Sequence, residues 1–420
     1  ALDSVAVAPL MRAARARDIP VVGEIELFAQ ALQALRESQN YLPDVLAVTG
    51  TNGKTTVTAL TAWLVNAAGR SAVAAGNIGP AALDALMSAL DGDCLPEVWV
   101  LELSSFQLES VRSLEPTAAT VLNITEDHLD WHGTLDAYAA TKARIFSRAK
   151  RIIVNRSDAR VRAMVTRIDA LNVCSFGVDE PQLAGDLGLE DGNGMAWLAE
   201  AAFDEIGHEP APRRKKGDAP AGREEGRLNR LMPADALQIR GRHNALNALA
   251  ALQLARSLDL SWAPLLRALR EYRGEPHRVS WVRNIAGVDF IDDSKGTNVG
   301  ATLAALQGLG CPVVLIAGGD GKGQDFSPLT PAVAEHARAV VLIGRDAGRL
   351  DQALAPSGVL RVHEQTLPGA VSRAMALAQP GDAVLLSPAC ASLDMFADYR
   401  ERAQVFTDAV NELALERGEV

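Results

Sequence analysis

Residues 45–56 read VLAVTGTNGKTT, and this stretch decides the fold. Its first four residues are apolar, as in a buried strand, and the glycine-containing turn from Gly50 to Gly53 follows them. The next residues, Thr55 to Ala68, favour a helix. A strand, a glycine loop and a helix in this order form a place where backbone N–H groups and the positive end of the helix dipole can bind a polyphosphate.

The side chains of this loop suit nucleotide phosphates. Lys54 would neutralise charge on the β- and γ-phosphates of ATP, and Thr55 would coordinate magnesium. The common motif GxxxxGK[ST] requires glycine at position 48, where this chain has Val48, so the loop is a shorter variant. A glycine turn that binds nothing is the plainer alternative at this point.

Apolar runs alternate with helical patterns along the rest of the chain, which predicts parallel α/β sheets. In residues 173–239 the apolar runs are short, glycine is frequent and the periodicity is weaker. A small additional β structure is expected there, before a helix at 244–258. Gly274 and Pro276 then break a helix, which predicts a domain boundary at about 274–277. The other expected strands are 98–103, 120–124, 151–154, 288–291, 313–316, 339–343 and 384–386, and the other expected helices include 134–149 and 394–416.

This pattern predicts a fold of the α/β class. We expect a parallel-sheet, P-loop-type central ATPase domain followed by a Rossmann-like α/β domain at the C-terminus. The charged stretch 209–227 has no apolar periodicity and is interpreted as a mobile surface loop. Its basic run, residues 213–216, could alternatively be an anion-docking patch.

The composition excludes several classes of protein. The chain has 420 residues, 48% hydrophobic and 22% charged, so it can form two or three globular domains and is neither disordered nor fibrous. Lys plus Arg number 41 and Asp plus Glu 52, and the resulting net charge of −11 disfavours nucleic acid as a partner.

Cysteine usage and hydropathy indicate the compartment. The 4 cysteines form no CxxC pair, which suits reduced thiols in the cytoplasm. The most apolar stretch, residues 71–90, contains asparagine, proline and aspartate, so no membrane insertion is expected. Near the N-terminus, arginines follow the short apolar part, which is the reverse of the order in a signal peptide.

Two further side chains stand at or just beyond strand ends. Glu102 lies in LELSSFQLE (101–109) and His128 in LNITEDHLDWHG (122–133). Because ligands of open α/β sheets bind at the carboxyl ends of strands, both can reach the phosphate edge and act as magnesium ligands. Taken singly, each is more often a solvated or structural residue. The position of Lys142 in the helical pattern 138–144 favours a surface lysine.

The second domain has three strand-end loops, DDSKGTN (292–298), GGDGKG (318–323) and SPACAS (387–392). Lys295 and Lys322 in the first two can hold an anionic substrate or stabilise charge that develops during phosphoryl or acyl transfer. The third loop leads into the last helix, which Ser392 and Asp394 are suited to cap. Cys390 could be a nucleophile, but no histidine lies near it in the sequence. The residues alone thus predict an ATP- and magnesium-dependent two-domain enzyme with an anionic co-substrate.

The ordered motifs resemble the Mur ligase family, and the last three resemble its D-glutamate-adding branch. They span nearly the whole chain. A phosphate loop alone would match folylpolyglutamate synthases equally well, so the later motifs distinguish the two groups. The resembling segments are TGTNGKTT (49–56), GNIG (76–79), LELSSFQLE (101–109), NITEDHLD (123–130), GRHNALNALAA (241–251), PHR (276–278), DDSKGTNVGAT (292–302), GGDGKGQDF (318–326) and SPACASLDMF (387–396).

The resemblance implies a cytoplasmic ligation in peptidoglycan precursor synthesis, and hence a part in cell wall biogenesis, cell shape and division. ATP would phosphorylate the terminal carboxylate of UDP-N-acetylmuramoyl-L-alanine, and the amine of D-glutamate would attack the acyl phosphate. A monomer is expected. A folylpolyglutamate synthase-like ligase and an ATP-gated binding protein are the alternatives.

The resemblance also implies roles for individual residues. ATP would be bound by Gly50, Asn52, Gly53, Lys54, Thr55, Thr56, Asn247, Arg278, Asp293 and Lys295. Two magnesium ions would be held by Thr55, Glu102, His128 and Lys142, the last as a carbamate, which reverses the surface interpretation of that lysine. The muramoyl substrate would contact Asn77, Ser104 and Gln107, and D-glutamate would contact Thr297, Lys322, Ser392 and Tyr399, the last of which the family can replace by Phe. The catalytic set would be Lys54, Lys142, His128, Lys295 and Lys322.

The expected domains are a remnant of an N-terminal uridine-nucleotide-binding domain (1–41), a central ATP-binding domain (42–274) and a C-terminal amino-acid-binding domain (275–420). Family members begin with a full uridine-nucleotide domain, whereas only its tail, ending in IPVVGEIELFAQAL (19–32), is expected here. The loop 209–227 is also longer than the family pattern needs.

Overall fold

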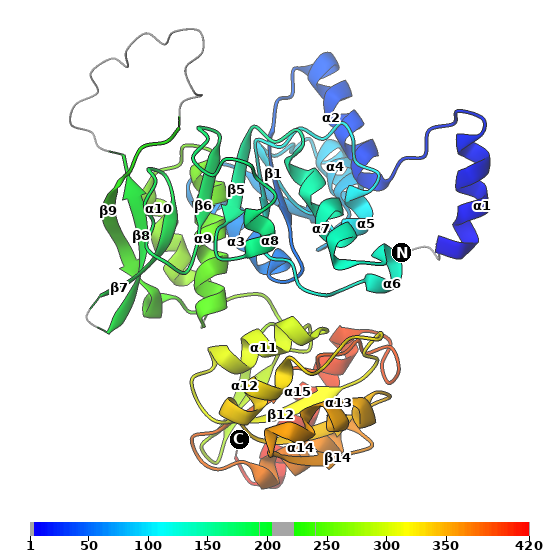
Figure 1. Ribbon diagram of the computed structural model, residues 1–420, viewed down its shortest axis with the longest axis vertical. Helices are drawn as coiled ribbons and strands as arrows, with labels where there is room; N and C mark the ends of the chain where they lie inside the picture. Colours follow the sequence, from blue (N-terminus) through cyan, green and yellow to red (C-terminus); the bar gives the residue numbers. More distant parts are fainter. Residues whose placement is uncertain (1–3, 193, 204–221, 240, 420) are drawn as a thin grey trace. The chain divides into compact units, whose positions relative to one another are not determined.

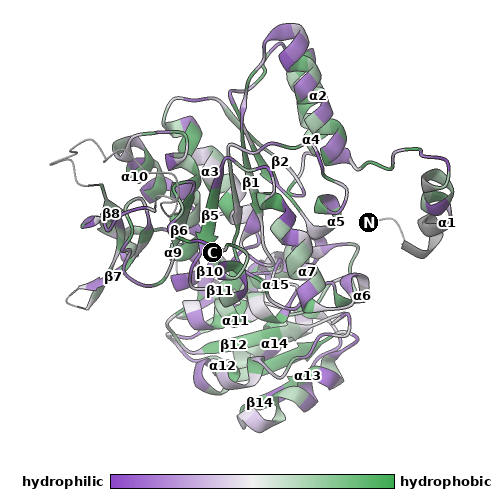
Figure 2. Ribbon diagram, turned by 45° about the horizontal axis from the view of Figure 1, so that its top comes forward, coloured by the Kyte–Doolittle hydropathy of each residue, from purple (hydrophilic) through white to green (hydrophobic). Residues whose placement is uncertain are grey.

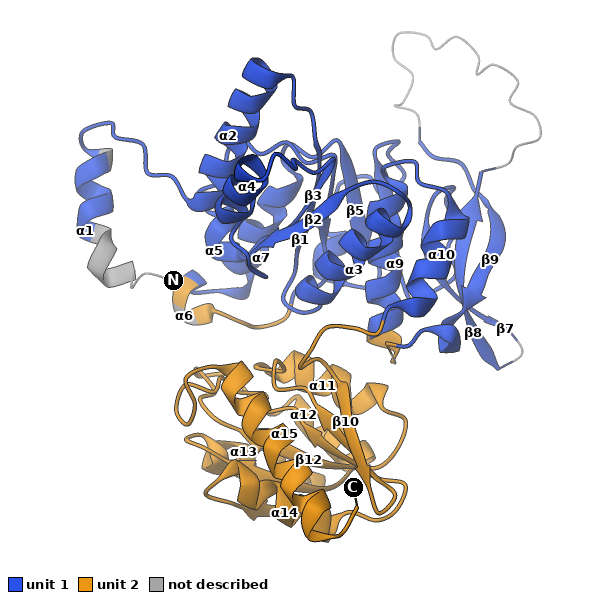
Figure 3. Ribbon diagram, turned by 180° about the vertical axis from the view of Figure 1, so that it is seen from behind, with its two compact units in different colours: residues 1–124, 132–238, 244–272 blue, residues 125–131, 239–243, 273–420 orange. Residues whose placement is uncertain are grey.

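The computed structural model describes residues 4–192, 194–203, 222–239 and 241–419. The chain divides into two compact units, coloured separately in Figure 3. The first unit comprises residues 1–124, 132–238 and 244–272, and the second comprises 125–131, 239–243 and 273–420. Each unit has its own sheet (Figure 1).

In the described part of the first unit, the sheet has the strand order β2-β3-β1-β4-β5-β6-β7-β8-β9. Pairing is parallel from β2 to β7 and antiparallel between β7, β8 and β9. The strands are β1 (Asp44–Thr49), β2 (Ala72–Gly76), β3 (Val98–Glu102), β4 (Ala118–Val121), β5 (Arg151–Asn155), β6 (Val173–Phe176), β7 (Leu187–Gly192), β8 (Met195–Ala202) and β9 (Arg227–Pro233).

The helices of this part are α1 (Ser4–Arg15), α2 (Glu24–Gln39), α3 (Lys54–Ala67), α4 (Ala82–Asp91), α5 (Ser105–Leu108), α7 (Leu135–Ala143), α8 (Ala159–Arg162), all but the first two residues of α9 (Arg242–Arg256), and α10 (Trp262–Glu271), with 3-10 turns at Arg144–Phe146 and Ala234–Ala236. Helices α1 and α2 precede β1, α9 and α10 follow β9, and the others lie between strands of the sheet. The short helix α6 (Leu129–His132) lies mostly in the segment 125–131 of the second unit.

The central strands of this sheet are buried on both faces, which parallel pairing requires. Val45 and Ala47 of β1 belong to one cluster with residues of α2 and α4, while their neighbours Leu46 and Val48 are equally buried and point to the opposite face. That face is covered by α3, whose Leu60 is also fully buried. Figure 2 shows the corresponding green, hydrophobic colour along β1 and β5.

The second unit holds the order β10-β11-β15-β12-β13-β14 in its described residues, parallel except for β10 against β11. Helices α14 and α15 cover one face, with Val314 and Ile316, and α11 to α13 cover the other, with Val313 and Leu315. The elements are β10 (Ser280–Ile285), β11 (Val288–Asp292), α11 (Val299–Gly308), β12 (Val313–Gly318), α12 (Leu329–His336), β13 (Ala337–Ile343), α13 (Ala347–Leu354), a 3-10 turn (Ala355–Ser357), β14 (Leu360–His363), α14 (Leu367–Leu377), β15 (Ala383–Leu386) and α15 (Tyr399–Glu416).

The expected fold class is confirmed, with local corrections. The helix expected at 134–149 leaves α-helical geometry after Ala143 and continues as a 3-10 turn. Ser392 and Asp394 do not cap the last helix, so that expectation was wrong. The helix begins at Tyr399, because Asp398 accepts hydrogen bonds from the backbone N–H groups of the first turn.

Strands β2, β10 and β14 were not anticipated. The alanines and the glycine of β2 have low strand propensity. The strand therefore depends on its parallel pairing with β3 rather than on its own sequence. The basic run 213–216 lies outside the described residues, as does most of the loop expected at 209–227. Among the residues that the structure describes, no helix combines the length and the apolar character that a membrane crossing needs.

Glu26 fastens α2 to the loop that precedes β4, and its removal should destabilise the protein. The Glu26 carboxylate is 4% exposed and accepts hydrogen bonds from the backbone N–H groups of Arg112 (2.7 Å) and Ser113 (3.0 Å). Because Glu26→Ala leaves these two N–H groups without their charged acceptor, we expect a loss of about 2–3 kcal/mol in unfolding free energy. Urea titration measures the loss. The exposed Glu37 of the same helix gives the control Glu37→Ala, and an equal loss in both variants would contradict the assignment.

Candidate active site

The candidate site of the first unit lies at the carboxyl ends of β1, β3 and β4. β1 pairs in parallel with β3 on one side and β4 on the other. The chain runs from β1 outward to β2 and returns through β3, then crosses to β4, so the strand order reverses at β1. Such reversals open a crevice in which ligands of α/β sheets bind. The loop 50–53 follows β1 at this position.

The loop has the backbone that its glycines allow. Gly53 adopts φ 82° as the N-cap of α3, a left-handed conformation that favours glycine. A Cβ at this position would also lie 2.5 Å from Asn247 Oδ1, so Asn247 packs directly against the loop. Lys54, Thr55 and Thr56 then form the first turn of α3, where the helix dipole is positive.

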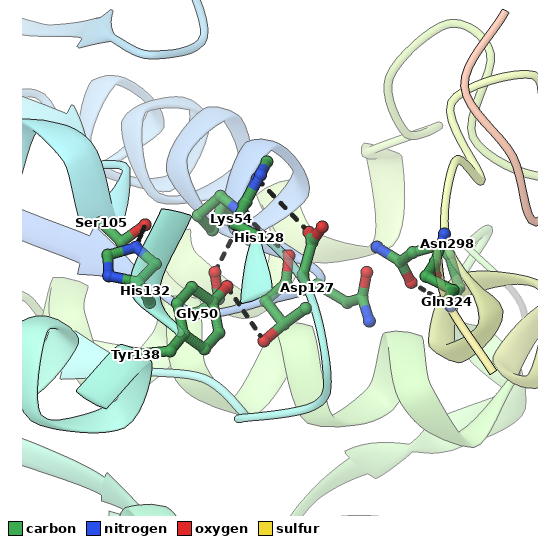
Figure 4. Close-up of polar contacts among 12 residues, drawn as sticks. Gly50, Lys54, Ser105, Asp127, His128, His132, Tyr138, Asn298 and Gln324 are labelled. Carbon is green, nitrogen blue, oxygen red and sulfur yellow. Dashed lines mark hydrogen bonds and ion pairs between the residues drawn. The ribbon is translucent and has the colours of Figure 1, made fainter. Parts of the chain in front are cut away.

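Two lysines converge on the loop. Lys54 Nζ donates to the carbonyl oxygens of Gly50 (2.9 Å) and Thr51 (2.7 Å), as Figure 4 shows for Gly50. Lys142 Nζ donates to the same Gly50 oxygen at 2.9 Å and to Thr49 Oγ1 at 3.2 Å. Lys142 is 1% exposed and its Nζ lies 4.7 Å from the ring centre of Tyr138. The interpretation of Lys142 as a surface lysine, which the sequence pattern alone favoured, is therefore wrong.

Glu102 ends β3 beside Val48, two residues before the loop begins, since the two are register partners. The carboxylate is 1% exposed, and its Oε1 accepts a hydrogen bond from Asn77 Nδ2 at 2.6 Å. Its Oε2 is buried and has no hydrogen-bond partner among the described residues. A buried carboxylate oxygen left in this way is costly unless a cation or donor joins it.

Three residues expected at the muramoyl substrate lie just beyond the ends of β2 and β3. Asn77 follows β2 and donates to Glu102, as described above. Ser104 and Gln107 form a capping box at the start of α5, with Ser104 Oγ accepting from the Gln107 N–H and Gln107 Oε1 accepting from the Ser104 N–H. The polar side chains in this part of the site are thus hydrogen-bonded to one another or to nearby backbone.

His128 belongs to the second unit, within the segment 125–131. Its backbone is left-handed, with φ 54°, and its Nε2 lies 3.6 Å from Asp127 Oδ2. Among the described residues, no group of three His, Cys, Asp or Glu side chains could hold a metal ion by itself.

In the second unit, the three expected loops follow β11, β15 and β12, which are adjacent strands. Asp293 Oδ2 accepts a hydrogen bond from Ser387 Oγ at 2.6 Å, and Ser387 Oγ also bonds Thr302 Oγ1 at 3.0 Å. Burial raises the pKa of Asp293 to about 7, although the Ser387 bond and Arg278 oppose this rise. Asp293 thus ties the loops after β11 and β15 together.

Lys295 and Tyr399 are in direct contact. Lys295 Nζ lies 3.7 Å from the centre of the Tyr399 ring, a cation–π distance. Thr297 is half-buried in the same loop, and Ser392 is 4% exposed in the loop after β15. Lys322 is exposed and left-handed, with φ 47°, and its N–H donates to Asp320 Oδ1 at 3.0 Å. This turn presents the Lys322 side chain to solvent.

Cys390 is unsuited to be a nucleophile. It is fully buried, and desolvation raises the pKa of its thiol to about 12. Its carbonyl instead accepts a hydrogen bond from Arg402 Nη1 at 3.1 Å. The Arg402 guanidinium is 1% exposed and also donates to the oxygen (2.8 Å) and Oγ (3.0 Å) of Ser294.

Sequence reasoning missed several residues that shape these sites. Asn123 and Tyr138 contact the phosphate loop, and Arg402 bridges two loops of the second unit. His132 Nε2 lies 3.0 Å from Ser105 Oγ (Figure 4). Asn123 stands in the quoted motif NITEDHLD, so the sequence contained a signal for it. Arg402 lies in a helical pattern full of charge, and nothing there marks it as buried.

Two protein-family models match the parts of the chain that contain these two sites. The Mur ligase middle domain matches residues 48–200, and the Mur ligase glutamate ligase domain matches residues 277–390. The chain belongs to the Mur ligase family, and the resemblance seen in its motifs is confirmed.

Relatives within the family are closer still. UDP-N-acetylmuramoylalanine--D-glutamate ligase of Bordetella parapertussis is 64% identical over 411 residues, which cover 98% of this chain and 81% of that protein. The protein of the same name from Paraburkholderia xenovorans is 57% identical over 411 residues, with the same coverage.

Solved structures share the fold. The MurF ligase of Thermotoga maritima, determined in complex with ADP, has a TM-score of 0.64 at 18% identity and covers 94% of this chain and 86% of its own. The UDP-N-acetylmuramate-alanine ligase MurC of the same organism has a TM-score of 0.61 at 21% identity, covering 96% and 82%. These likenesses concern the fold alone.

The raised pKa of Asp293 should make stability depend on pH. Between its ordinary value near 3.8 and about 7, the folded protein holds a proton that the unfolded chain releases, so stability falls as pH rises through this window. The slope is at most about 1.4 kcal/mol per pH unit. Asp293→Asn should remove this contribution, which thermal unfolding at pH 5 to 8 would reveal as a flatter profile.

The control for this test is Asp408→Asn, because Asp408 is exposed on α15. It should reproduce the profile of the unchanged chain. If Asp293→Asn also gave a profile parallel to that of the unchanged chain, Asp293 would not be the group responsible.

Proposed function

We propose that the chain is an ATP-dependent ligase that joins D-glutamate to UDP-N-acetylmuramoyl-L-alanine in peptidoglycan precursor synthesis. The observation that carries this proposal is the identity of 57–64% to ligases named for that reaction, over 98% of the chain. The 42–274 region would bind ATP and the 275–420 region the amino acid. We propose a monomer in the cytoplasm, where its four free cysteines would stay reduced.

The chemistry has two steps. A carboxylate oxygen of the muramoyl substrate attacks the γ-phosphorus of ATP, the bond from that phosphorus to the β,γ-bridging oxygen breaks, and ADP leaves. The amine nitrogen of D-glutamate then attacks the acyl carbon, loses a proton and displaces inorganic phosphate. Neither step needs covalent participation by the protein, whose part is positioning and charge neutralisation.

Lys54 would exchange its bonds to the Gly50 and Thr51 carbonyl oxygens for the phosphate oxygens of ATP. It is already placed at the loop, so the exchange needs a rotation of the side chain and no refolding. The loop N–H groups and the first turn of α3 would add donors to the same phosphates. Asn247, Arg278, Asp293 and Lys295 are the further residues proposed to contact ATP.

The donor set of the first unit fits magnesium. The partnerless Oε2 of Glu102 is a hard, buried ligand, and Thr55 offers a hydroxyl in the first turn of α3. Bound magnesium would neutralise charge on the transferring phosphoryl group. His128 is proposed as a further ligand from its motif.

A carbamate on Lys142 is proposed because of the charge around Gly50. Two ammonium groups donate to one carbonyl oxygen, and Lys142 has almost no access to water that would screen their repulsion. In carbamylation the neutral amine of Lys142 would bond to the carbon of carbon dioxide and release a proton to solvent. The resulting anion would remove this repulsion and would offer an oxygen ligand for a second magnesium ion.

The amino-acid site is proposed at Thr297, Lys322, Ser392 and Tyr399. The exposed ammonium of Lys322 would pair with a carboxylate of D-glutamate, and the two hydroxyl residues would donate hydrogen bonds to it. Tyr399, in contact with Lys295, would link this acceptor region to a residue proposed for ATP.

The reaction is tested by measuring phosphate release from ATP in the presence of UDP-N-acetylmuramoyl-L-alanine. Release should require D-glutamate, and L-glutamate should not replace it. Because the chain spans 81% of its Bordetella parapertussis relative, the assay is run on the chain and on the chain extended by the part of that relative that it does not cover.

Three other outcomes would each point elsewhere. Turnover with L-glutamate and a folate acceptor would indicate a folylpolyglutamate synthase-like enzyme. ATP turnover without any acceptor, unchanged by Lys322→Ala, would indicate an ATP-gated binding protein. Release indifferent to the amino acid in both chains would overturn the proposal.

The Lys142 carbamate makes a separate prediction. Lys142→Ala should lose most ligation activity, at least about a hundredfold, because a charged ligand of the metal site is removed. Short carboxylic acids should restore part of it by replacing the carbamate. The control is Lys150→Ala, on the loop before β5. Full activity in Lys142→Ala would contradict the assignment, and loss without rescue would leave a lysine role that is not a carbamate.

A further inference from the structure

Asn123 lies at the carboxyl ends of two neighbouring strands, where the loops that follow them begin. It follows β4 by two residues, and β4 pairs in parallel with β1. The ladder continues past both strands, since the Leu122 N–H donates to the Thr49 oxygen at 2.8 Å and the Thr51 N–H donates to the Asn123 oxygen at 2.9 Å. The backbone of Asn123 therefore already fixes the second residue of the phosphate loop.

The side chain of Asn123 fixes the next loop residue at two points. The Asn52 N–H donates to Asn123 Oδ1 at 2.8 Å, and Asn123 Nδ2 donates to the Asn52 oxygen at 3.1 Å. One carboxamide thus satisfies both backbone polar groups of Asn52, as a paired strand would. Aspartate could not do so, because its second oxygen would face the Asn52 oxygen without a proton.

We propose that Asn123 is a positioning residue that holds the phosphate loop in its nucleotide-receiving conformation. The inference rests on the proposed binding of ATP to this loop. Asn123 does not touch the reacting atoms; it acts through Asn52 and Thr51.

The loop needs such a clamp because its own sequence does not fix it. Gly50 and Gly53 flank Thr51 and Asn52, and glycine has the greatest backbone freedom. The Thr51 oxygen also receives Lys54, so fixing Thr51 and Asn52 fixes one of the two acceptors that hold the lysine. A loop ordered before ATP arrives does not have to lose that freedom on binding, which favours affinity.

Asn155 offers a matched control. It ends β5, the next strand in the sheet, and it also bonds two backbone groups: its Nδ2 donates to the Leu122 oxygen at 2.7 Å, and its Oδ1 accepts from the Ser157 N–H at 3.0 Å. It touches neither Thr51 nor Asn52 through these bonds. A loss of general stability should therefore affect Asn155→Ala and Asn123→Ala alike, whereas a loss of loop order should affect Asn123→Ala alone.

The experiment measures binding of a non-hydrolysable ATP analogue with magnesium by titration calorimetry, on the full 420-residue chain. Asn123→Ala should raise the Kd about tenfold or more, because two hydrogen bonds that order the loop are lost. Asn155→Ala should keep the Kd within about twofold, even though its melting temperature falls. Asn123→Asp, which keeps the size of the side chain, should also weaken binding.

Hydrogen exchange of the nucleotide-free chain gives a second readout. The peptide covering residues 49–56 should exchange faster in Asn123→Ala and unchanged in Asn155→Ala. An unchanged Kd and unchanged exchange in both Asn123 variants would overturn the inference while ATP binding itself stood. If the unchanged chain failed to bind the analogue, the proposed function would fail first, and unchanged exchange in Asn123→Ala would still decide against the clamp. If Asn123→Ala did not fold, Asn123→Asp would serve alone in both measurements.

Discussion

The parallel pairing of β1 with β3 and β4 is the constraint on which the first site depends. Because the three strands run side by side in one direction, their last residues come out at one edge, within reach of one ligand. Val48 and Glu102 are register partners, and the Leu122 N–H bonds the Thr49 oxygen. The phosphate loop, the buried carboxylate and Asn123 are therefore neighbours by sheet geometry, although up to seventy-odd residues separate them in the chain. A register shift of one residue in either pair would exchange core side chains for site side chains.

The charges at this edge are only partly balanced by the protein. Lys54 and Lys142 bring two positive charges to one carbonyl oxygen, and Glu102 brings a carboxylate with one oxygen that receives no hydrogen bond from the residues that the structure describes. A well-packed interior does not normally leave polar atoms in this condition, because each costs free energy without return. Such imbalance is typical of sites that are completed by a charged ligand. A polyphosphate would balance the positive charges of the two lysines, and a divalent cation would balance the negative charge of Glu102.

The sequence predicted these residues better than their contacts. The apolar runs gave both sheets and the order of most elements, since burial on two faces forces strands of continuous apolar residues. The strand-end rule placed Glu102 and the phosphate loop together. Lys142 shows the limit, because periodicity describes which face a residue occupies and not whether that face is covered; the helix turns Lys142 towards the loop, and its contact with Tyr138 comes from the fold. Strand β2 was missed because its alanines carry little intrinsic preference.

The two units solve one structural problem by different side chains. A glycine-bearing loop at a strand end leaves several backbone N–H and C=O groups without ladder partners, and these must be satisfied if the loop is to keep one conformation. In the first unit a neutral carboxamide, Asn123, pairs both groups of Asn52. In the second, the buried guanidinium of Arg402 donates to Ser294 and Cys390 and so joins two loops.

The difference between the two clamps follows from what must be held. One peptide group presents a donor and an acceptor, which an amide matches, whereas two loops that both present oxygens need a side chain with donors only. Burial lowers the pKa of Arg402 to about 10, so its charge is costly but retained near neutral pH. Removing the guanidinium would leave three oxygen acceptors of two loops without their donor. Burying the charged side chain therefore costs less free energy in this position than leaving those acceptors unsatisfied.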